Sequence, residues 1–371
     1  MRVQRVMMPD SGRESWTLLG DDLRPVEPVE RFLAYLAAVE KSPNTIKAYA
    51  HDLKDWWDYL TRRRVGWRLA TLEDVAGFVA WLRLPPQARD GRVTVLPTVE
   101  HHCSASSVNR KLAALASFCE FHARHGVDLA GLLVRMQPAA RRGSATSYKP
   151  FLHHVTKNNP ERRRAINLRT SSPRPKVLTV KQVQTILDAC DHLRDRLLFA
   201  VLLDVGVRIG EALGLRHEDM RIAERQVTVI PRDNDNGARA KAGRSRVIPA
   251  SPELMRLYAD YLNGEYGALD SDYVFVNLWA EPLGRPWTYP AVYDLVLRLR
   301  ERTGIDFEPH QYRHTYATWL LRRGAGMESL KELLGHASIT TTIDTYGHLT
   351  VEDARRTLEA AGWFTGREVQ L

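Results

Sequence analysis

Five residues in the second half of the chain have the types and the spacing needed for chemistry on a phosphodiester. His310 and Arg313 form a His-x-x-Arg pair, and Tyr346 follows His336 by ten residues. Arg208 lies far upstream, between two glycines. The planar fork of an arginine binds two oxygens of one phosphate, and a tyrosine hydroxyl can be a covalent nucleophile once its proton is removed. The set therefore predicts that a phenolic oxygen attacks phosphorus.

Each of these residues taken alone has a commoner structural explanation. A single arginine is usually a surface or packing residue, a single histidine belongs to the core, and Gly335 before His336 is typical of a helix C-cap. His310 and Arg313, however, lie three residues apart on a helix that we expect to begin at Pro309, so both side chains can reach one phosphate. The combination favours the chemical interpretation.

Three runs of sequence carry a resemblance to a known family. The Gly-Val-Arg-Ile-Gly-Glu run around Arg208 resembles the family's first arginine motif, and His310 begins a His-x-x-Arg-His-x-x-Ala-Thr motif that contains Arg313. The Leu-Gly-His run at His336 precedes Tyr346 at the family's distance. The chain thus resembles the tyrosine recombinases, or phage integrases, which exchange DNA strands. The resemblance implies that the arginines and histidines surround the scissile phosphate, while the tyrosine forms a 3′-phosphotyrosyl link and frees a 5′-hydroxyl.

The resemblance also points to Lys241 as the group that protonates the leaving 5′-oxygen. Lys241 lies in the turn of an expected β-hairpin with strands at 226–230 and 246–248. A lysine ammonium can give up a proton, whereas a guanidinium in practice does not. Arg239 and Arg244 are rival candidates and expected DNA contacts, and a solvated turn lysine is the plain alternative.

Two further residues belong to these motifs. Glu211 follows Arg208 by three residues and is expected to orient an arginine or a nearby backbone group. His314 directly follows Arg313 and is less suited to contacting the phosphate. Glu211 is not expected to react.

Composition favours a polyanionic partner. The chain has 371 residues, 44% of them hydrophobic, and a formal net charge of +9. This length is sufficient for a core and indicates two domains. A positive net charge favours nucleic acid as the partner first and an acidic membrane second. The alternative is a soluble protein that is merely basic.

Cysteine usage and the N-terminal sequence exclude several other classes. The three cysteines are widely spaced and form no Cys-x-x-Cys pair, so we expect neither a disulfide framework nor a zinc site. The His101-His102-Cys103 run is better explained as a polar loop than as a metal site. No signal-peptide core or long apolar run is present, which indicates a bacterial cytoplasmic protein that is not bound to a membrane.

We expect a mainly α-helical fold with a small β-hairpin or sheet, arranged as a two-domain DNA clamp. The expected parts are a loosely ordered N-terminal extension, a helical core-site DNA-binding domain, a basic linker, a mixed α+β catalytic domain and a tail. Their bounds are 1–27, 28–137, 138–176, 177–361 and 362–371.

Local signals place several helix ends. Ser42, Thr71, Ser107 and Thr179 are expected helix N-caps, and Gly126 closes the helix that Ser107 opens.

Basic residues outside the motifs are expected to contact DNA phosphates. In the helical domain these are Lys47, Arg110 and Lys111, although solvated charges on amphipathic helices would look the same. In the linker they are Arg162, Arg163 and Arg164. The linker is either a strap along the DNA backbone or a solvated, unstructured connection.

The resemblance implies double-stranded DNA with specific recombination sites as the partner. It further implies a homotetramer on two duplexes, a monomer or weakly associated protein in the free state, and helper proteins in some systems. The covalent link conserves the bond energy, so no nucleotide cofactor or metal is expected. The linker and C-terminal segments look closer to integrases of mobile elements, including the transposase A type of Tn554-like transposons, than to chromosome-dimer resolvases. The alternatives are a type IB topoisomerase-like enzyme and a DNA-binding regulator that has lost catalysis.

Overall fold

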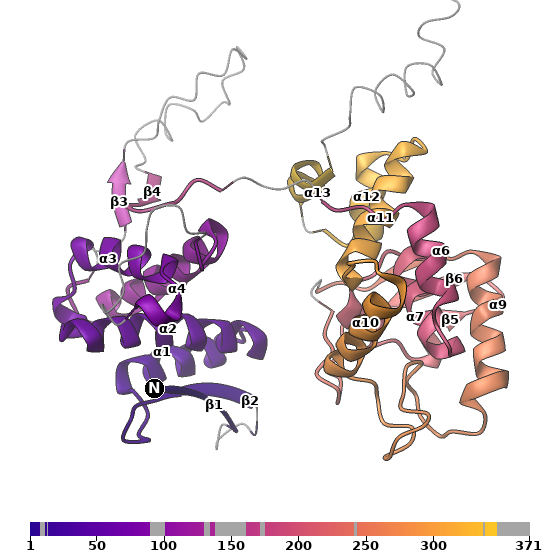
Figure 1. Cartoon of the computed structure of the whole chain (residues 1–371), viewed down its shortest axis with the longest axis horizontal. Helices are drawn as coiled ribbons and strands as arrows, with labels where there is room; N and C mark the ends of the chain where they lie inside the picture. The colour runs from indigo at the N-terminus through magenta and orange to yellow at the C-terminus, as the bar shows by residue number, and fades with distance from the viewer. Residues whose placement is uncertain are drawn as a thin grey trace, which may run out of the picture. The chain divides into compact units, whose positions relative to one another are not determined.

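The computed structural model describes the residues 1–7, 12, 14–89, 101–129, 134–137, 161–170, 175–240, 243–336 and 338–346. The chain divides into two compact units, Met1–Ser172 and Pro173–Leu371. Helices dominate both units (Figure 1).

The described residues of the first unit form four helices, each of which begins where a local signal allows. They are α1 (Glu27–Ala38), α2 (Pro43–Arg63), α3 (Leu72–Arg83) and α4 (Ala105–Arg124), accompanied by short 3-10 turns at Trp67–Leu69 and Pro86–Ala88. The expected caps at Ser42 and Thr71 are confirmed, since each side chain accepts a backbone N–H of the first turn. The expected cap at Ser107 is wrong: Ser104 caps α4, and the backbone N–H of Ser107 donates to its hydroxyl.

The N-terminal residues form a hairpin where we expected loose order. Strands β1 (Arg2–Met7) and β2 (Glu14–Leu19) pair antiparallel, with Arg2 opposite Leu19. β2 packs against α1 and α2 (Figure 1). Leu18 of β2 is fully buried in the core of the first unit. The expectation failed because these strands are short and their apolar residues gain their burial from helices later in the chain.

Part of the expected linker is also ordered. Strand β3 (Val134–Gln137) pairs antiparallel with β4 (Glu161–Arg164), so the three arginines 162–164 lie in a strand rather than in an unstructured stretch. Further along, the Asn109 side chain bonds both backbone groups of Leu168. Ile166 and Leu168 pack on the helices of the first unit, so the chain stays attached to that unit up to this point.

The second unit combines helices with one small sheet. Its helices are α6 (Val180–Asp188), α7 (Leu193–Asp204), α8 (Ile209–Ala212), α9 (Pro252–Tyr261), α10 (Tyr289–Thr303), α11 (Pro309–Arg322), α12 (Met327–Leu334) and α13 (Ile339–Tyr346), with short helical turns at His217–Asp219 and Leu262–Tyr266. The strands β5 (Met220–Arg221), β6 (Gln226–Val229) and β7 (Arg246–Pro249) form an antiparallel sheet in chain order. The expected β-hairpin is confirmed, with Val227 opposite Ile248, and so is the expected cap at Thr179.

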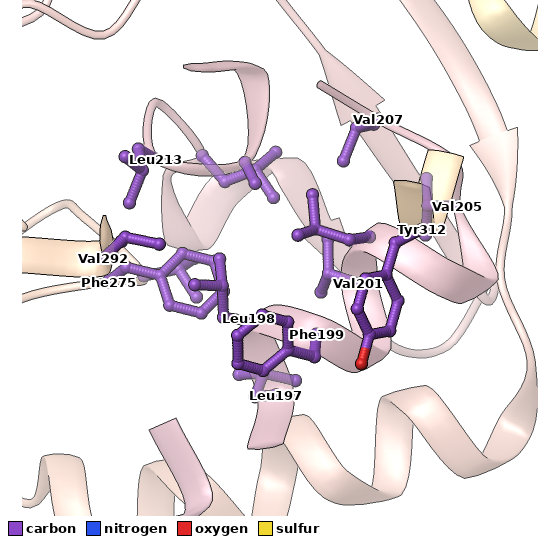
Figure 2. Packing of buried hydrophobic residues seen from close by; sticks show 14 of the residues in the cluster. Leu197, Leu198, Phe199, Val201, Val205, Val207, Leu213, Phe275, Val292 and Tyr312 are labelled. Atoms are coloured by element: carbon purple, nitrogen blue, oxygen red, sulfur yellow. The ribbon is translucent and has the colours of Figure 1, made fainter. Parts of the chain in front are cut away.

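The core of the second unit is centred on α7 and positions two functional segments. Leu197, Leu198 and Val201 of α7 are fully buried (Figure 2). The chain continues from α7 through buried Val205 and Val207 to Arg208. The ring of Tyr312, on α11, lies 5.3 Å between centroids from that of Phe199 on α7. Both the turn before Arg208 and the helix that carries Arg313 are therefore anchored in one core.

Candidate active site

Arg208 lies at the start of α8 and is held by Glu211. Gly206 makes the preceding turn with φ of +66°, a conformation that favours glycine. The Glu211 carboxylate accepts the Arg208 backbone N–H at 2.9 Å and its guanidinium at 3.0 Å. The Arg208 side chain is 24% exposed, so part of its fork remains open to a ligand. The expected orienting contact of Glu211 is present.

Arg246, which sequence reasoning did not assign, completes this pair. It reaches from β7 to Glu211 with Nη2–Oε2 at 2.7 Å, and its Nε donates to the Leu333 carbonyl at 3.0 Å. Burial alone would raise the pKa of Glu211, but the hydrogen bonds and charges of Arg246 and Arg208 outweigh burial and lower it. The carboxylate is therefore ionised, and it links the start of α8 to the sheet and to the end of α12.

Arg313 is deeply buried, with 1% of its surface exposed. Its guanidinium donates to the carbonyls of Gly206 at 2.8 Å and Leu334 at 2.6 Å. Burial first, and then the charge of Arg208, lowers the pKa of Arg313 to about 10, so it stays positive at neutral pH. Arg208 and Arg246 both bond the carboxylate of Glu211, and Arg313 lies close enough for its charge to interact with all three groups. The excess positive charge suits an anionic ligand such as a phosphate.

His336 directly follows Gly335, whose left-handed backbone conformation ends α12. Gly335 ends α12 with φ of +63°, which confirms the expected glycine C-cap. The Nδ1 of His336 lies 2.9 Å from the Thr342 hydroxyl. Burial, followed by the charges of Arg313 and Arg208, lowers the pKa of His336 to about 4. The imidazole is thus neutral at neutral pH and retains one N–H donor.

Tyr346 ends α13 and is 7% exposed. Its ring packs in a small cluster with Ala317, Leu330 and Leu334. Its Oη lies 2.8 Å from Nδ1 of His314. Burial raises the pKa of Tyr346 to about 12, although the nearby charges of Arg313 and Arg208 oppose this rise. The phenol is protonated in this state.

His310 and His314 share one face of α11. Their ring centroids lie 4.4 Å apart in an edge-to-face arrangement. His310 is exposed at the start of the helix, while His314 faces Tyr346. Their spacing of four residues already placed both on one helix face, but no sequence signal pointed to the contact of His314 with Tyr346. The structure gives His314 a partner that the motif alone did not.

A cavity of about 660 Å³ opens beside this cluster. Arg208 and His336 line it, together with Arg244 and Arg246 of the hairpin and Lys331 of α12. Lys241 lies outside the described residues. Arg239 forms an ion pair with Asp233 at 3.4 Å. The expected catalytic arginines, His336 and Tyr346 thus converge from separate elements of the second unit.

The expected DNA contacts of the first unit have protein partners in this structure. The Lys47 ammonium lies 4.6 Å from the centre of the Trp16 ring. Lys111 pairs with Asp52 at 3.1 Å and Asp55 at 2.6 Å. Arg110 also pairs with Asp52 but is 53% exposed. A phosphate would therefore have to compete with carboxylates for Lys111, whereas Arg110 remains accessible. The side chains of Arg162, Arg163 and Arg164 are not among those described.

Two absences hold for the described part of the chain. No group of three or more His, Cys, Asp and Glu side chains there is arranged to hold a metal ion. No helix within those residues is long and apolar enough to cross a membrane.

Replacing Gly335 with Ala should destabilise the second unit. A left-handed alanine costs about 1–2 kcal/mol, and the added Cβ would lie 2.9 Å from Nη1 of Arg246. Gly304 is the matched control, since it ends α10 with φ of +67° and has nothing within 4 Å of an added Cβ. We expect chemical denaturation to show a larger loss of unfolding free energy for Gly335→Ala than for Gly304→Ala. Equal losses would mean that Arg246 shifts without cost.

Comparisons with known proteins match both units of the chain to one family. Residues 176–353 match the Phage integrase family, and residues 29–126 match the Phage integrase, N-terminal SAM-like domain. Transposase A from transposon Tn554 of Staphylococcus aureus is 38% identical over 357 residues, which cover 96% of each chain. Tyrosine recombinase XerA of Pyrococcus horikoshii is 27% identical over 333 residues, covering 90% of this chain and 93% of XerA.

Solved structures share the fold. The Tn1549 transposon integrase in complex with circular intermediate DNA has a TM-score of 0.58 at 17% identity, covering 90% of this chain and 98% of that one. A lambda integrase dimer bound to a core site has a TM-score of 0.54 at 16% identity, covering 85% and 96%. The predominantly helical fold with small sheets that the sequence predicted is confirmed.

The family match and the relatives define an enzyme that cleaves and rejoins DNA strands. The chain belongs to the phage integrase family, the tyrosine recombinases. The family resemblance seen in the sequence is therefore confirmed.

Proposed function

We propose that this recombinase is the integrase or transposase of a mobile element and acts on double-stranded DNA with specific recombination sites. Two findings support the proposal. The relative at 38% identity is a transposase and aligns over 96% of both chains. Transposon integrases bound to their DNA share its fold. The basic net charge of +9 fits the same partner.

The convergence of Arg208, Arg313 and His336 beside Tyr346 is the observation that carries the chemistry. Each arginine retains free N–H groups, because an arginine has five donors and these two give one and two of them to the protein. Those donors would hold the non-bridging oxygens of the scissile phosphate. Positive groups fixed before the reaction stabilise charge that develops in the transition state.

The remaining groups complete one cleavage step. His336 would donate its free imidazole N–H to a non-bridging oxygen, since Nδ1 already faces Thr342. His310, exposed on α11, would lie on the same phosphate. Tyr346 Oη would bond to phosphorus as the bond to the 5′-oxygen breaks, and Lys241 would protonate that oxygen. The 5′-hydroxyl of the second duplex reverses the step and joins the strands.

Strand exchange also requires an assembly. One protomer supplies one tyrosine and cleaves one strand, so four strands on two duplexes require four protomers. We therefore infer a tetramer on DNA, a monomer or weakly associated protein in solution, and helper proteins where the element supplies them. The two units would close on the duplex as a clamp, with Lys47, Arg110, Lys111, Arg239, Arg244 and Arg162–Arg164 as backbone contacts.

A plasmid with two copies of the element's end sequence tests the function. Recombined products support the proposed activity. Relaxation of supercoils without recombined products would indicate a type IB topoisomerase-like enzyme. Binding without either reaction would indicate a regulator.

Strand cleavage should survive an excess of chelator. The arginines, Lys241 and His336 fill the roles that metal ions play in other phosphoryl-transfer sites. We expect the same yield of covalent adduct with EDTA as with Mg²⁺. A strict loss of cleavage in EDTA that Mg²⁺ restores would contradict this mechanism.

A further inference from the structure

The hydroxyl of Tyr346 contacts a histidine ring nitrogen. Its Oη lies 2.8 Å from Nδ1 of His314. Within the described residues, Oη has no other hydrogen-bond partner. His314 and Arg313 are neighbours on α11, so the turn of helix that holds the phosphate-binding arginine also holds the tyrosine hydroxyl.

The protonation states of the two groups suit this contact to proton transfer. Burial first, then the charges of His310, Arg313 and His336, lowers the pKa of His314 to about 4. Its imidazole is therefore neutral at neutral pH and has one nitrogen that accepts a hydrogen bond. In the tautomer that carries its proton on Nε2, Nδ1 of His314 accepts the Oη–H of Tyr346. In this tautomer the proton that must leave during attack points at a group that can receive it.

We propose that His314 is the general base of strand cleavage, with Nδ1 taking the phenolic proton as Oη attacks phosphorus. The proposal rests on Tyr346 being the nucleophile. The Oη–P bond forms and the P–O5′ bond breaks, while the phenolic proton passes to Nδ1 and the leaving oxygen is protonated by Lys241. When a 5′-hydroxyl later attacks the phosphotyrosine, the imidazolium returns its proton to Oη. His314 is thus a catalytic residue that touches the reacting atom.

The charges around His314 are compatible with this role. The imidazole is a weak base in the free protein because Arg313, His310 and His336 all oppose its protonation. A bound phosphodiester adds a negative charge beside these groups, and a nearby negative charge raises an imidazole pKa. Attack also makes the phenol far more acidic as its oxygen bonds to phosphorus. Both changes favour transfer in the complex and not before it.

The other two histidines are placed for different work. His336 has its Nδ1 on Thr342, and His310 is exposed at the first turn of α11. Among the described residues, His336 makes no hydrogen bond to Tyr346. We therefore assign His314 to proton transfer, and His336 and His310 to binding the phosphate.

His314→Asn tests the base directly. The Asn amide oxygen keeps a hydrogen-bond acceptor close to the position of Nδ1 but does not take up a proton. We expect cleavage of a suicide substrate to slow by about 10²-fold or more, with binding of the same DNA and the melting temperature close to those of the unchanged protein. The exposed His102 is a matched control, and His102→Asn should cleave at the normal rate.

A fluorinated tyrosine at position 346 distinguishes proton removal from positioning. Its phenol is more acidic and depends less on a base, so it should recover most of the rate that His314→Asn loses. Should the Asn variant prove unstable, His314→Ala with free imidazole supplies a second test, and imidazole should accelerate its cleavage. A full rate for His314→Asn, or a deficit that neither fluorination nor imidazole reduces, would overturn the proposal.

Failure of the nucleophile would look different. If Tyr346 is not the nucleophile, Tyr346→Phe still forms covalent adducts, whatever His314 does. If only the base assignment is wrong, Tyr346→Phe forms none while His314→Asn cleaves normally.

Discussion

Tyr346→Phe is expected to reduce covalent protein–DNA adducts on a nicked suicide substrate to background. The substitution removes the oxygen that would bond to phosphorus and leaves the ring in its cluster with Ala317, Leu330 and Leu334. Without that oxygen no phosphotyrosyl bond can form, so the loss should be complete rather than partial. Denaturing gels of the reaction with labelled DNA measure it.

The fold and DNA binding should survive this change. The variant loses one hydrogen bond to His314, which is worth about 0.5–1.5 kcal/mol. Tyr312→Phe is a matched control in the same unit, because the buried Tyr312 hydroxyl has no hydrogen-bond partner among the described residues. The control should form adducts normally. Adducts in Tyr346→Phe would transfer the nucleophile role to another residue.

Lys241→Ala is expected to show the second largest effect. A general acid contributes about 10²–10⁴-fold to a rate, because an unprotonated 5′-oxygen is a poor leaving group. We expect cleavage of a normal phosphodiester to fall by a factor in that range. A 5′-bridging phosphorothiolate leaves without a proton, so it should be cleaved by the variant nearly as fast as by the unchanged protein.

Two arginines of the same hairpin provide the comparison. Arg239 is paired with Asp233, and Arg244 lines the cavity beside Arg208. Arg239→Ala and Arg244→Ala should be impaired equally on both substrates, since an arginine binds phosphate but does not release a proton. Equal impairment of Lys241→Ala on both substrates would reduce Lys241 to a positioning group. Rescue of Arg244→Ala instead would move the acid role along the hairpin.

The sequence predicted features whose partners lie within one turn of chain. Ser42, Thr71 and Thr179 cap helices because each hydroxyl meets a backbone N–H three residues later. Gly335 ends α12 because its left-handed conformation suits glycine. Even here the register was uncertain, and Ser104 rather than Ser107 caps α4, because several serines compete within a few residues.

The family motifs made it possible to predict the residues of the site as well, although these lie far apart in sequence. They brought Arg208, Arg313, His336 and Tyr346 together as an expectation, and the structure places these residues in one cluster of the second unit. The motifs did not predict the strands at the two ends of the first unit. The β1–β2 hairpin and the β3–β4 pair gain their order from partners far away in sequence.

Tertiary structure alone decided which side chains meet across the fold. Glu211 binds Arg246 of a later strand, Arg313 donates to the Gly206 carbonyl, and Lys111 binds carboxylates of another helix. His314 meets Tyr346, a contact that the motif did not predict. Composition and spacing determine which groups a chain possesses and which face of a helix they occupy. Their hydrogen bonds, charges and protonation states depend on distances of a few ångströms, and packing of the whole core sets those distances.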